Sequence, residues 1–169
     1  EISEAWRDIW EDREVRVTII TGEGERHFCG GHNLAPRPGV TAEEREFLRS
    51  YRMYWPLGGT VNGAKTGVDG RMGDHYPRVW KPVIAAVNGW AAGAGLYLLL
   101  ASTDIRIASA EHARFKFALL SQGWLGNGPG ATLLMKQLRY ADAMRILLTD
   151  EPVEADEALR IGLGNEVVP

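Results

Sequence analysis

The sequence predicts an α/β protein in which parallel β-strands alternate with helices. Two β-branched runs, Val15–Thr21 and Val83–Val87, have the composition of strands. A continuous apolar segment, Leu96–Ala101, follows the second run and is typical of a buried helix. Because strands that alternate with helices form layers, we expect a layered parallel sheet with surrounding helices.

The N-terminal half carries further signals. Apolar residues recur at helical spacing from Ile2 to Trp10, so we expect an amphipathic helix there. The segment Gly22–Gly24 ends the first strand. Thr41–Glu44 fits a capping box and predicts a helix start. The glycine-rich segment Pro56–Asp74 predicts a mobile loop.

The C-terminal half predicts one more strand and three helices. The strand is expected at Ile105–Ala108, and Gly123–Gly130 has the composition of a loop. Helical patterns cover Ala131–Tyr140, Ala141–Leu148 and Val153–Ile161.

Composition narrows the class of protein. The 169 residues, 45% hydrophobic and 24% charged, predict one soluble domain over residues 1–169. A net charge of −3 with scattered Lys and Arg argues against nucleic acid as a partner. The apolar stretch Ala91–Ala101 is too short to cross a membrane. The single cysteine, Cys29, excludes an internal disulfide and favours a reducing, cytoplasmic location.

Two small-residue turns are the strongest functional signal. Gly30–Asn33 and Gly93–Gly95 each follow a strand and can lead into a helix. A helix start offers unpaired backbone N–H groups and a positive dipole end. If the strands are neighbours, two N–H groups could converge on one oxygen and stabilise negative charge on it. The spacing fits equally well with glycines that only let elements pack tightly.

Five segments of the chain together resemble the crotonase superfamily, also called the enoyl-CoA hydratase/isomerase family. They are Val17–Gly22, Phe28–Leu34, Lys81–Gly95, Thr103–Ala108 and Ala155–Pro169. The resemblance covers most of the chain in order, and only residues 35–80 depart in length and content. It implies the ClpP/crotonase fold without the usual N-terminal hairpin and C-terminal helices. The chain also lacks an initiator methionine, so we expect a fragment or a processed form.

The resemblance implies an oxyanion hole for a thioester carbonyl. Its two donors map to the backbone N–H groups of His32 and Ala94. The family usually has glycine at the second position, but alanine keeps the N–H group when its φ is negative. The neighbouring residues Gly31, Asn33, Leu34 and Gly93 would bind the substrate.

The acid–base residues depart from the family pattern. The hydratases use two glutamates, and those positions map to Tyr97 and Leu119, with Ala118 in place of a proline. Leucine cannot transfer a proton, and a phenol with an ordinary pKa near 10 is a poor base at neutral pH. Tyr97 is therefore a candidate catalytic residue, and Leu119, Trp124 and Asn127 are candidate substrate contacts.

The remaining polar candidates have simpler interpretations. Asp74–His75 could supply an acid or base, although a solvated loop end explains it as well. Cys29 lies among glycines and Phe28 and is expected to pack in the interior. Asp104 is expected to brace the end of a strand, and His112 to lie on a turn at the surface.

By resemblance, we expect an enoyl-CoA hydratase/isomerase-type enzyme, an acyl-CoA lyase or isomerase of fatty acid metabolism. We expect no metal and no cofactor apart from the coenzyme A of the substrate, no membrane or nucleic-acid partner, and a homotrimer or hexamer. The missing glutamates leave two alternatives open. One is a different crotonase reaction, such as C–C bond hydrolysis, decarboxylation or dehalogenation, using Tyr97 or Asp74–His75. The other is a non-catalytic member that binds acyl-CoA or serves assembly.

Overall fold

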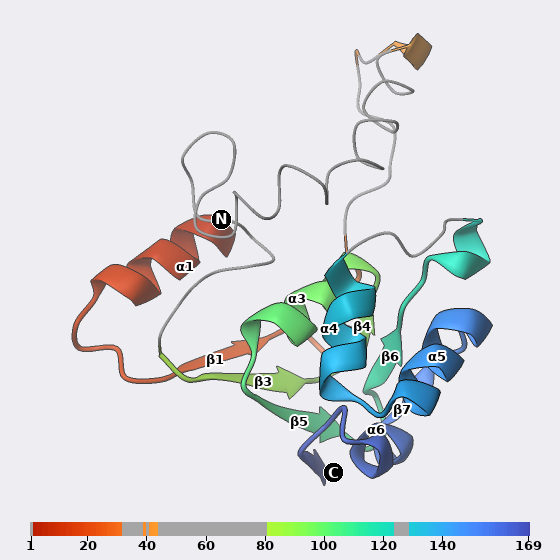
Figure 1. Ribbon diagram of the computed structural model, residues 1–169. Coiled ribbons are helices and arrows are strands. Elements are labelled where there is room, and N and C mark those ends of the chain that lie inside the picture. The colour runs from red at the N-terminus through yellow and green to blue at the C-terminus, as the bar shows by residue number, and fades with distance from the viewer. Residues whose placement is uncertain (1, 32–38, 40, 44–80, 124–128) are drawn as a thin grey trace.

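The computed structural model describes residues 2–31, 39, 41–43, 81–123 and 129–169 (Figure 1). The predicted helix behind Thr41, the predicted loop Pro56–Asp74 and the Asp74–His75 candidate fall largely or wholly outside these ranges. The first helix, α1 (Ile2–Glu11), is confirmed. Its Trp6 is buried in a cluster with Val83 and Leu98.

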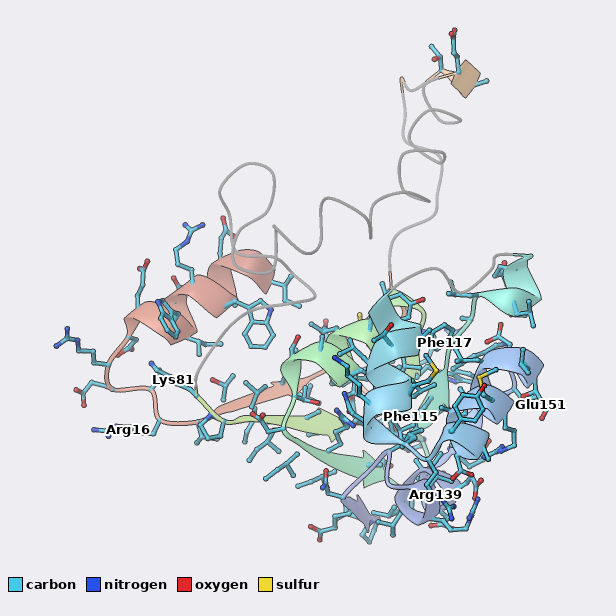
Figure 2. The ribbon with its side chains drawn as sticks, viewed as in Figure 1. Arg16, Lys81, Phe115, Phe117, Arg139 and Glu151 are labelled. Atoms are coloured by element: carbon cyan, nitrogen blue, oxygen red, sulfur yellow. The ribbon has the colours of Figure 1, made fainter. Side chains whose placement is uncertain are left out.

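Lys81 ties α1 to the body of the protein. Its ammonium group donates to the carbonyl oxygen of Ile9 at 2.6 Å and to that of Asp12 (Figure 2). A cation at the C-terminal end of a helix binds carbonyl groups that have no partner inside the helix, and it complements the helix dipole. Lys81, two residues before the strand that begins at Val83, therefore also fixes the position of α1.

The first sheet is parallel and has the strand order β1-β3-β5-β8. Its strands are β1 (Thr18–Thr21), β3 (Val83–Val87), β5 (Ile105–Ser109) and β8 (Glu166–Val168). The strands predicted from the β-branched runs are confirmed, although β1 begins three residues after Val15. Alternate residues of β3 are buried, so one face of this sheet covers the core.

The second sheet has the order β2-β4-β6-β7. It contains β2 (His27–Cys29), β4 (Trp90–Ala92), β6 (Arg114–Lys116) and β7 (Val153–Glu154). The pairs β2–β4 and β4–β6 are parallel, and β6–β7 is antiparallel. The first six strands join the two sheets alternately, and both sheets receive their first three strands in the same order; β7 then joins the second sheet and β8 the first.

The helices that follow the strands enclose one hydrophobic core. They are α3 (Ala94–Ser102), α4 (Pro129–Gln137), α5 (Tyr140–Thr149) and α6 (Ala155–Ile161). Helix α3 is apolar on all sides and packs against α4 (Figure 1). Leu99 of α3 and Leu134 of α4 are fully buried in this core together with Phe115 of β6.

Several boundaries differ from the prediction. Helix α4 begins at Pro129, inside the predicted loop Gly123–Gly130, and Tyr140, predicted as its last residue, is the first residue of α5. Two further differences involve strands. The small residues around Ala91 form strand β4, and the helix begins only at Ala94, near the predicted Gly93. Val153, predicted as helical, pairs with Phe115 in strand β7, so α6 begins at Ala155. In both cases pairing with a distant strand overrides a local pattern that also suits a helix. None of the helices within the described residues combines the length and apolar character needed to span a bilayer.

Candidate active site

The turn between β4 and α3 exposes the first backbone N–H groups of a buried helix. Gly93 has φ 54° and ψ −123°, and its N–H donates to the carbonyl oxygen of Lys116 at 3.1 Å. The first bond of α3 runs from the Tyr97 N–H to the Gly93 carbonyl at 3.1 Å. No side chain caps the first turn of α3, so its first amides have no hydrogen-bond partner within the helix or from a capping side chain. Ala94 has a negative φ, the condition under which alanine can replace glycine here.

The first small-residue turn lies directly against the second. Gly31 has φ +89°, and a β-carbon at this position would lie 2.9 Å from the Ala94 nitrogen and 2.9 Å from the Ala92 oxygen. The register of β2 and β4, which pairs Cys29 with Ala91, brings the two turns to the same end of the sheet. The expected side-by-side arrangement is therefore present at Gly31 and Ala94.

The predicted partner donor, His32, lies outside the described residues, as do Asn33, Leu34, Trp124 and Asn127. Convergence of the His32 and Ala94 amides on one oxygen stays a prediction. The described part of the site consists of Gly31 on one turn, Gly93 and Ala94 on the other, and the side chains that surround them.

The helix start is held on strand β2 by main-chain contact. A β-carbon at Gly95 would lie 2.0 Å from the carbonyl oxygen of Cys29, so only glycine allows α3 to approach this closely. The Cys29 side chain is half-buried and packs against the core, in agreement with its predicted packing role. The position of the α3 amides is thus set by backbone atoms of two neighbouring strands.

Tyr97 forms one wall beside the turns. Its ring lies 5.3 Å from the ring of Phe117 at an interplanar angle of 56°. A β-carbon at Gly130 would lie 2.2 Å from the Cε1 atom of Tyr97, so the ring also contacts the start of α4. The hydroxyl oxygen is buried. The ring of Tyr97, the residue predicted at the first glutamate position, therefore contacts both Phe117, directly after β6, and the start of α4.

Leu119 lies in a turn with an unusual backbone. Ala118, which precedes it, has φ +56°, a conformation that costs a non-glycine residue about 1–2 kcal/mol and that proline cannot adopt. Leu119 itself is half-buried and packs against the core, followed by a short 3-10 turn over Leu120–Gln122. Leu119, predicted at the second glutamate position, is therefore an apolar side chain on a strained turn.

Asp150 is a residue that the sequence interpretation missed. It ends helix α5 with φ +51°, and its side chain reaches back to the turn that contains Leu119. Its position at the end of a predicted helix could have identified it. A carboxylate at a helix C-terminus is repelled by the helix dipole and therefore needs a compensating hydrogen-bond partner elsewhere.

Two other candidates have structural roles. The Asp104 carboxylate accepts a hydrogen bond from the Val83 N–H at 2.8 Å, and the Asp104 N–H donates to the Val83 oxygen at 2.8 Å. The predicted brace between strand ends is thereby confirmed. His112 lies on the β5–β6 turn, half-buried, with its Nε2 3.8 Å from Glu25 and 3.9 Å from Glu111.

His112 borders an open cleft of about 250 Å³ that also includes Arg26, Trp90 and Arg114. Trp90 and Arg114 begin strands β4 and β6, whereas the small-residue turns follow the opposite ends of β2 and β4. The cleft is therefore separate from the candidate active site. Among the described residues, no three His, Cys, Asp or Glu side chains are grouped to hold a metal ion.

The two sheets, the buried helix α3 and the contact between the small-residue turns define a protein of the crotonase fold. An enoyl-CoA hydratase structure from Bacillus anthracis matches 99% of this chain at a TM-score of 0.74 and 28% identity, over 58% of its own length. A carnitinyl-CoA dehydratase structure from Mycobacterium avium matches 99% of this chain at a TM-score of 0.69 and 32% identity, over 57% of its length.

The sequence comparisons agree with the fold. The family model described as enoyl-CoA hydratase/isomerase matches residues 71–169. The (E)-benzylidenesuccinyl-CoA hydratase of Thauera aromatica is 34% identical over 169 residues, and the short-chain-enoyl-CoA hydratase of Clostridium acetobutylicum is 35% identical over 162 residues. The chain spans 58% and 54% of the lengths of these two relatives. It belongs to the enoyl-CoA hydratase/isomerase family, within the crotonase superfamily.

Proposed function

We propose that the protein acts on an acyl-CoA thioester and stabilises its enolate between the backbone N–H groups of His32 and Ala94. The observation that carries this proposal is the contact between the two turns, where a β-carbon on Gly31 would lie 2.9 Å from the Ala94 nitrogen. The Ala94 amide stands at the start of a buried helix, where the dipole favours negative charge. One such donor contributes about 3–4 kcal/mol to lowering a reaction barrier.

The proposed reaction is hydration, dehydration or isomerisation of an enoyl-CoA. Relatives named as hydratases and dehydratases of CoA esters support this choice. Each of these reactions passes through negative charge on the thioester oxygen, which backbone donors stabilise without a metal ion. We include in the proposal a homotrimer or a dimer of trimers.

A second candidate is a different crotonase reaction, such as C–C bond hydrolysis, decarboxylation or dehalogenation. Leu119 at the predicted second glutamate position favours it, because leucine cannot supply the second acid–base group that hydration by two glutamates requires. Product analysis by mass spectrometry on a panel of acyl-CoA and cyclic diketone substrates separates the two candidates. Coenzyme A binding without turnover of any substrate would instead favour the non-catalytic alternative.

The decisive experiment replaces Ala94 by proline. Ala94 is the first residue of α3, a position where proline is well tolerated, and the substitution replaces the N–H hydrogen by a ring carbon. We expect Ala94→Pro to lower the turnover of crotonyl-CoA, followed by loss of the enoyl absorbance, by about 100- to 1000-fold.

Tyr140→Pro is the matched control. Tyr140 is the first residue of α5, and the preceding Arg139 has φ −60° and ψ 142°, which suits a residue before proline. This variant should keep wild-type turnover. A folded Ala94→Pro protein as active as the Tyr140→Pro protein would refute the role of the Ala94 amide.

A further inference from the structure

The proposed mechanism leaves one nearly fully buried carboxylate unused. Asp150, 3% exposed, receives hydrogen bonds from the Ala118 N–H on Oδ1 at 2.6 Å and from the Ser121 N–H on Oδ2 at 2.8 Å. A buried carboxylate is stable only when it is paired. Here the partners are main-chain amides of one turn, residues 118–121, which lies about 30 positions earlier in the chain.

The Asp150 side chain is charged, which strengthens the hydrogen bonds that it accepts from the turn. Burial acts to raise its pKa, but the side-chain and backbone hydrogen bonds from Ser121, the backbone hydrogen bond from Ala118 and the positive charge of Lys116 together hold the pKa below its ordinary value. The side chain is therefore ionised at neutral pH and accepts charge-assisted hydrogen bonds, which are stronger than neutral ones.

The turn that Asp150 holds adjoins the candidate active site. It follows strand β6, where the Lys116 oxygen receives the Gly93 N–H of the second small-residue turn. Phe117, directly before the turn, packs on the ring of Tyr97. The same turn carries Leu119 against the core. Displacement of residues 118–121 would therefore move both side chains that occupy the family's glutamate positions.

We propose that Asp150 is a positioning residue for the acyl-CoA site, holding the 118–121 turn so that Leu119 and Tyr97 keep their places beside the α3 amides. Both carboxylate oxygens are engaged by amides of the turn, so Asp150 acts through the turn and not as the general base. This inference rests on the proposed function, because it assigns the turn to a substrate site.

The test compares three variants of the purified protein. Asp150→Asn keeps the shape but turns a donor toward one of the two amides. Asp150→Gly removes the carboxylate and suits the positive φ at this position. Glu151→Gln is the matched control, since it makes the same change of charge one residue away on an exposed side chain, which Figure 2 shows at the outer edge of the molecule.

The readouts are kinetics with crotonyl-CoA and hydrogen exchange of the Ala118 and Ser121 amides. We expect faster exchange at both amides in Asp150→Asn and Asp150→Gly, and a loss of about 10- to 100-fold in kcat with a smaller change in KM. Glu151→Gln should behave as wild type. The same loss of kcat in a well-folded Asp150→Gly protein separates positioning from general destabilisation.

Two results would overturn the inference. In the first, exchange at Ala118 and Ser121 accelerates but kcat stays within about twofold of wild type, so that the turn does not position the site. In the second, exchange is unchanged, so that Asp150 does not hold the turn. If the wild-type protein turns over no acyl-CoA, the proposed function fails separately, and calorimetric affinity for crotonyl-CoA becomes the readout. A loss of that affinity in Asp150→Asn and Asp150→Gly but not in Glu151→Gln would support the inference, and equal or absent affinity in all proteins would overturn it.

Discussion

At the scale of single residues, the site depends on positions where no side chain fits. Gly31 has φ +89° and borders the Ala94 amide, whereas Gly24 has φ +70° with no atom within 4 Å of an added β-carbon. The two glycines therefore share a backbone conformation but differ in their surroundings. That difference allows strain and crowding to be separated by experiment.

We predict that Gly31→Ala lowers crotonyl-CoA turnover by about 100-fold, because the methyl group would lie 2.9 Å from the Ala94 nitrogen and would push this amide out of position. Gly24→Ala carries a similar conformational cost of about 1–2 kcal/mol without crowding, and it should retain full activity. Steady-state kinetics and thermal unfolding of both variants check the prediction. Equal turnover in the two proteins would contradict it.

At the scale of elements, Arg106 joins four parts of the fold. It lies on β5, is buried, and donates to the Thr103 hydroxyl (3.1 Å), the Leu163 carbonyl (3.2 Å) and the Gln137 side chain (2.6 Å). These groups belong to the loop after α3, the segment before β8 and the end of α4. Burial lowers the pKa of the guanidinium to about 10, partly offset by Asp104, so it is still charged at neutral pH.

We predict that Arg106→Met destabilises the protein by about 2–4 kcal/mol, because several buried acceptors lose their donor at once. Arg106→Lys keeps the charge but offers a single nitrogen, and it should fall between Met and wild type. The free energies of unfolding of the three proteins, measured by urea denaturation, check this order. A fully stable Arg106→Met protein would show that these four elements hold together without the guanidinium.

At the scale of the whole molecule, the C-terminal helices carry exposed apolar side chains. Leu148 of α5 is 64% exposed and Leu159 of α6 is 43% exposed. The two helices are joined by an ion pair between Arg145 and Glu157 at 2.5 Å, so the two leucines lie on neighbouring elements. Ile19 of β1, 65% exposed, lies on the first sheet, away from these helices (Figure 1).

We predict that this helical region forms the interface of the proposed homo-oligomer, because clustered apolar surface is typical of protein contacts. Leu148→Glu should shift the protein toward monomer in analytical ultracentrifugation, and Ile19→Glu should leave its mass unchanged. A wild-type protein that is monomeric at micromolar concentration would contradict the proposed assembly.

The sequence predicted the features that local patterns control. Glycines 31 and 95 could be identified because close approach of two backbones requires a residue without a side chain. The strand at Val83–Val87 and the apolar helix after Gly93 were also predicted correctly, because the composition of a few consecutive residues identifies them.

Features that depend on distant partners could not be predicted. Strand β4 is three residues long and is defined by pairing with His27 and Arg114. Its Ala-Ala sequence suits a helix equally well. Asp150 finds its partners at Ala118 and Ser121, and no local pattern links these positions. Residues 32–34, which carry the predicted first donor, lie outside the described residues.

The close contacts at Gly31 and Gly95 are made with main-chain atoms, namely the Ala92 oxygen, the Ala94 nitrogen and the Cys29 oxygen. The geometry of these contacts therefore does not depend on the identity of the side chains farther along α3 or β6. Under the proposed function, mutation can exchange the proton-transferring groups and leave the two turns untouched. Such a scaffold is free to diversify its chemistry in evolution, as the tyrosine and leucine at the predicted glutamate positions suggest.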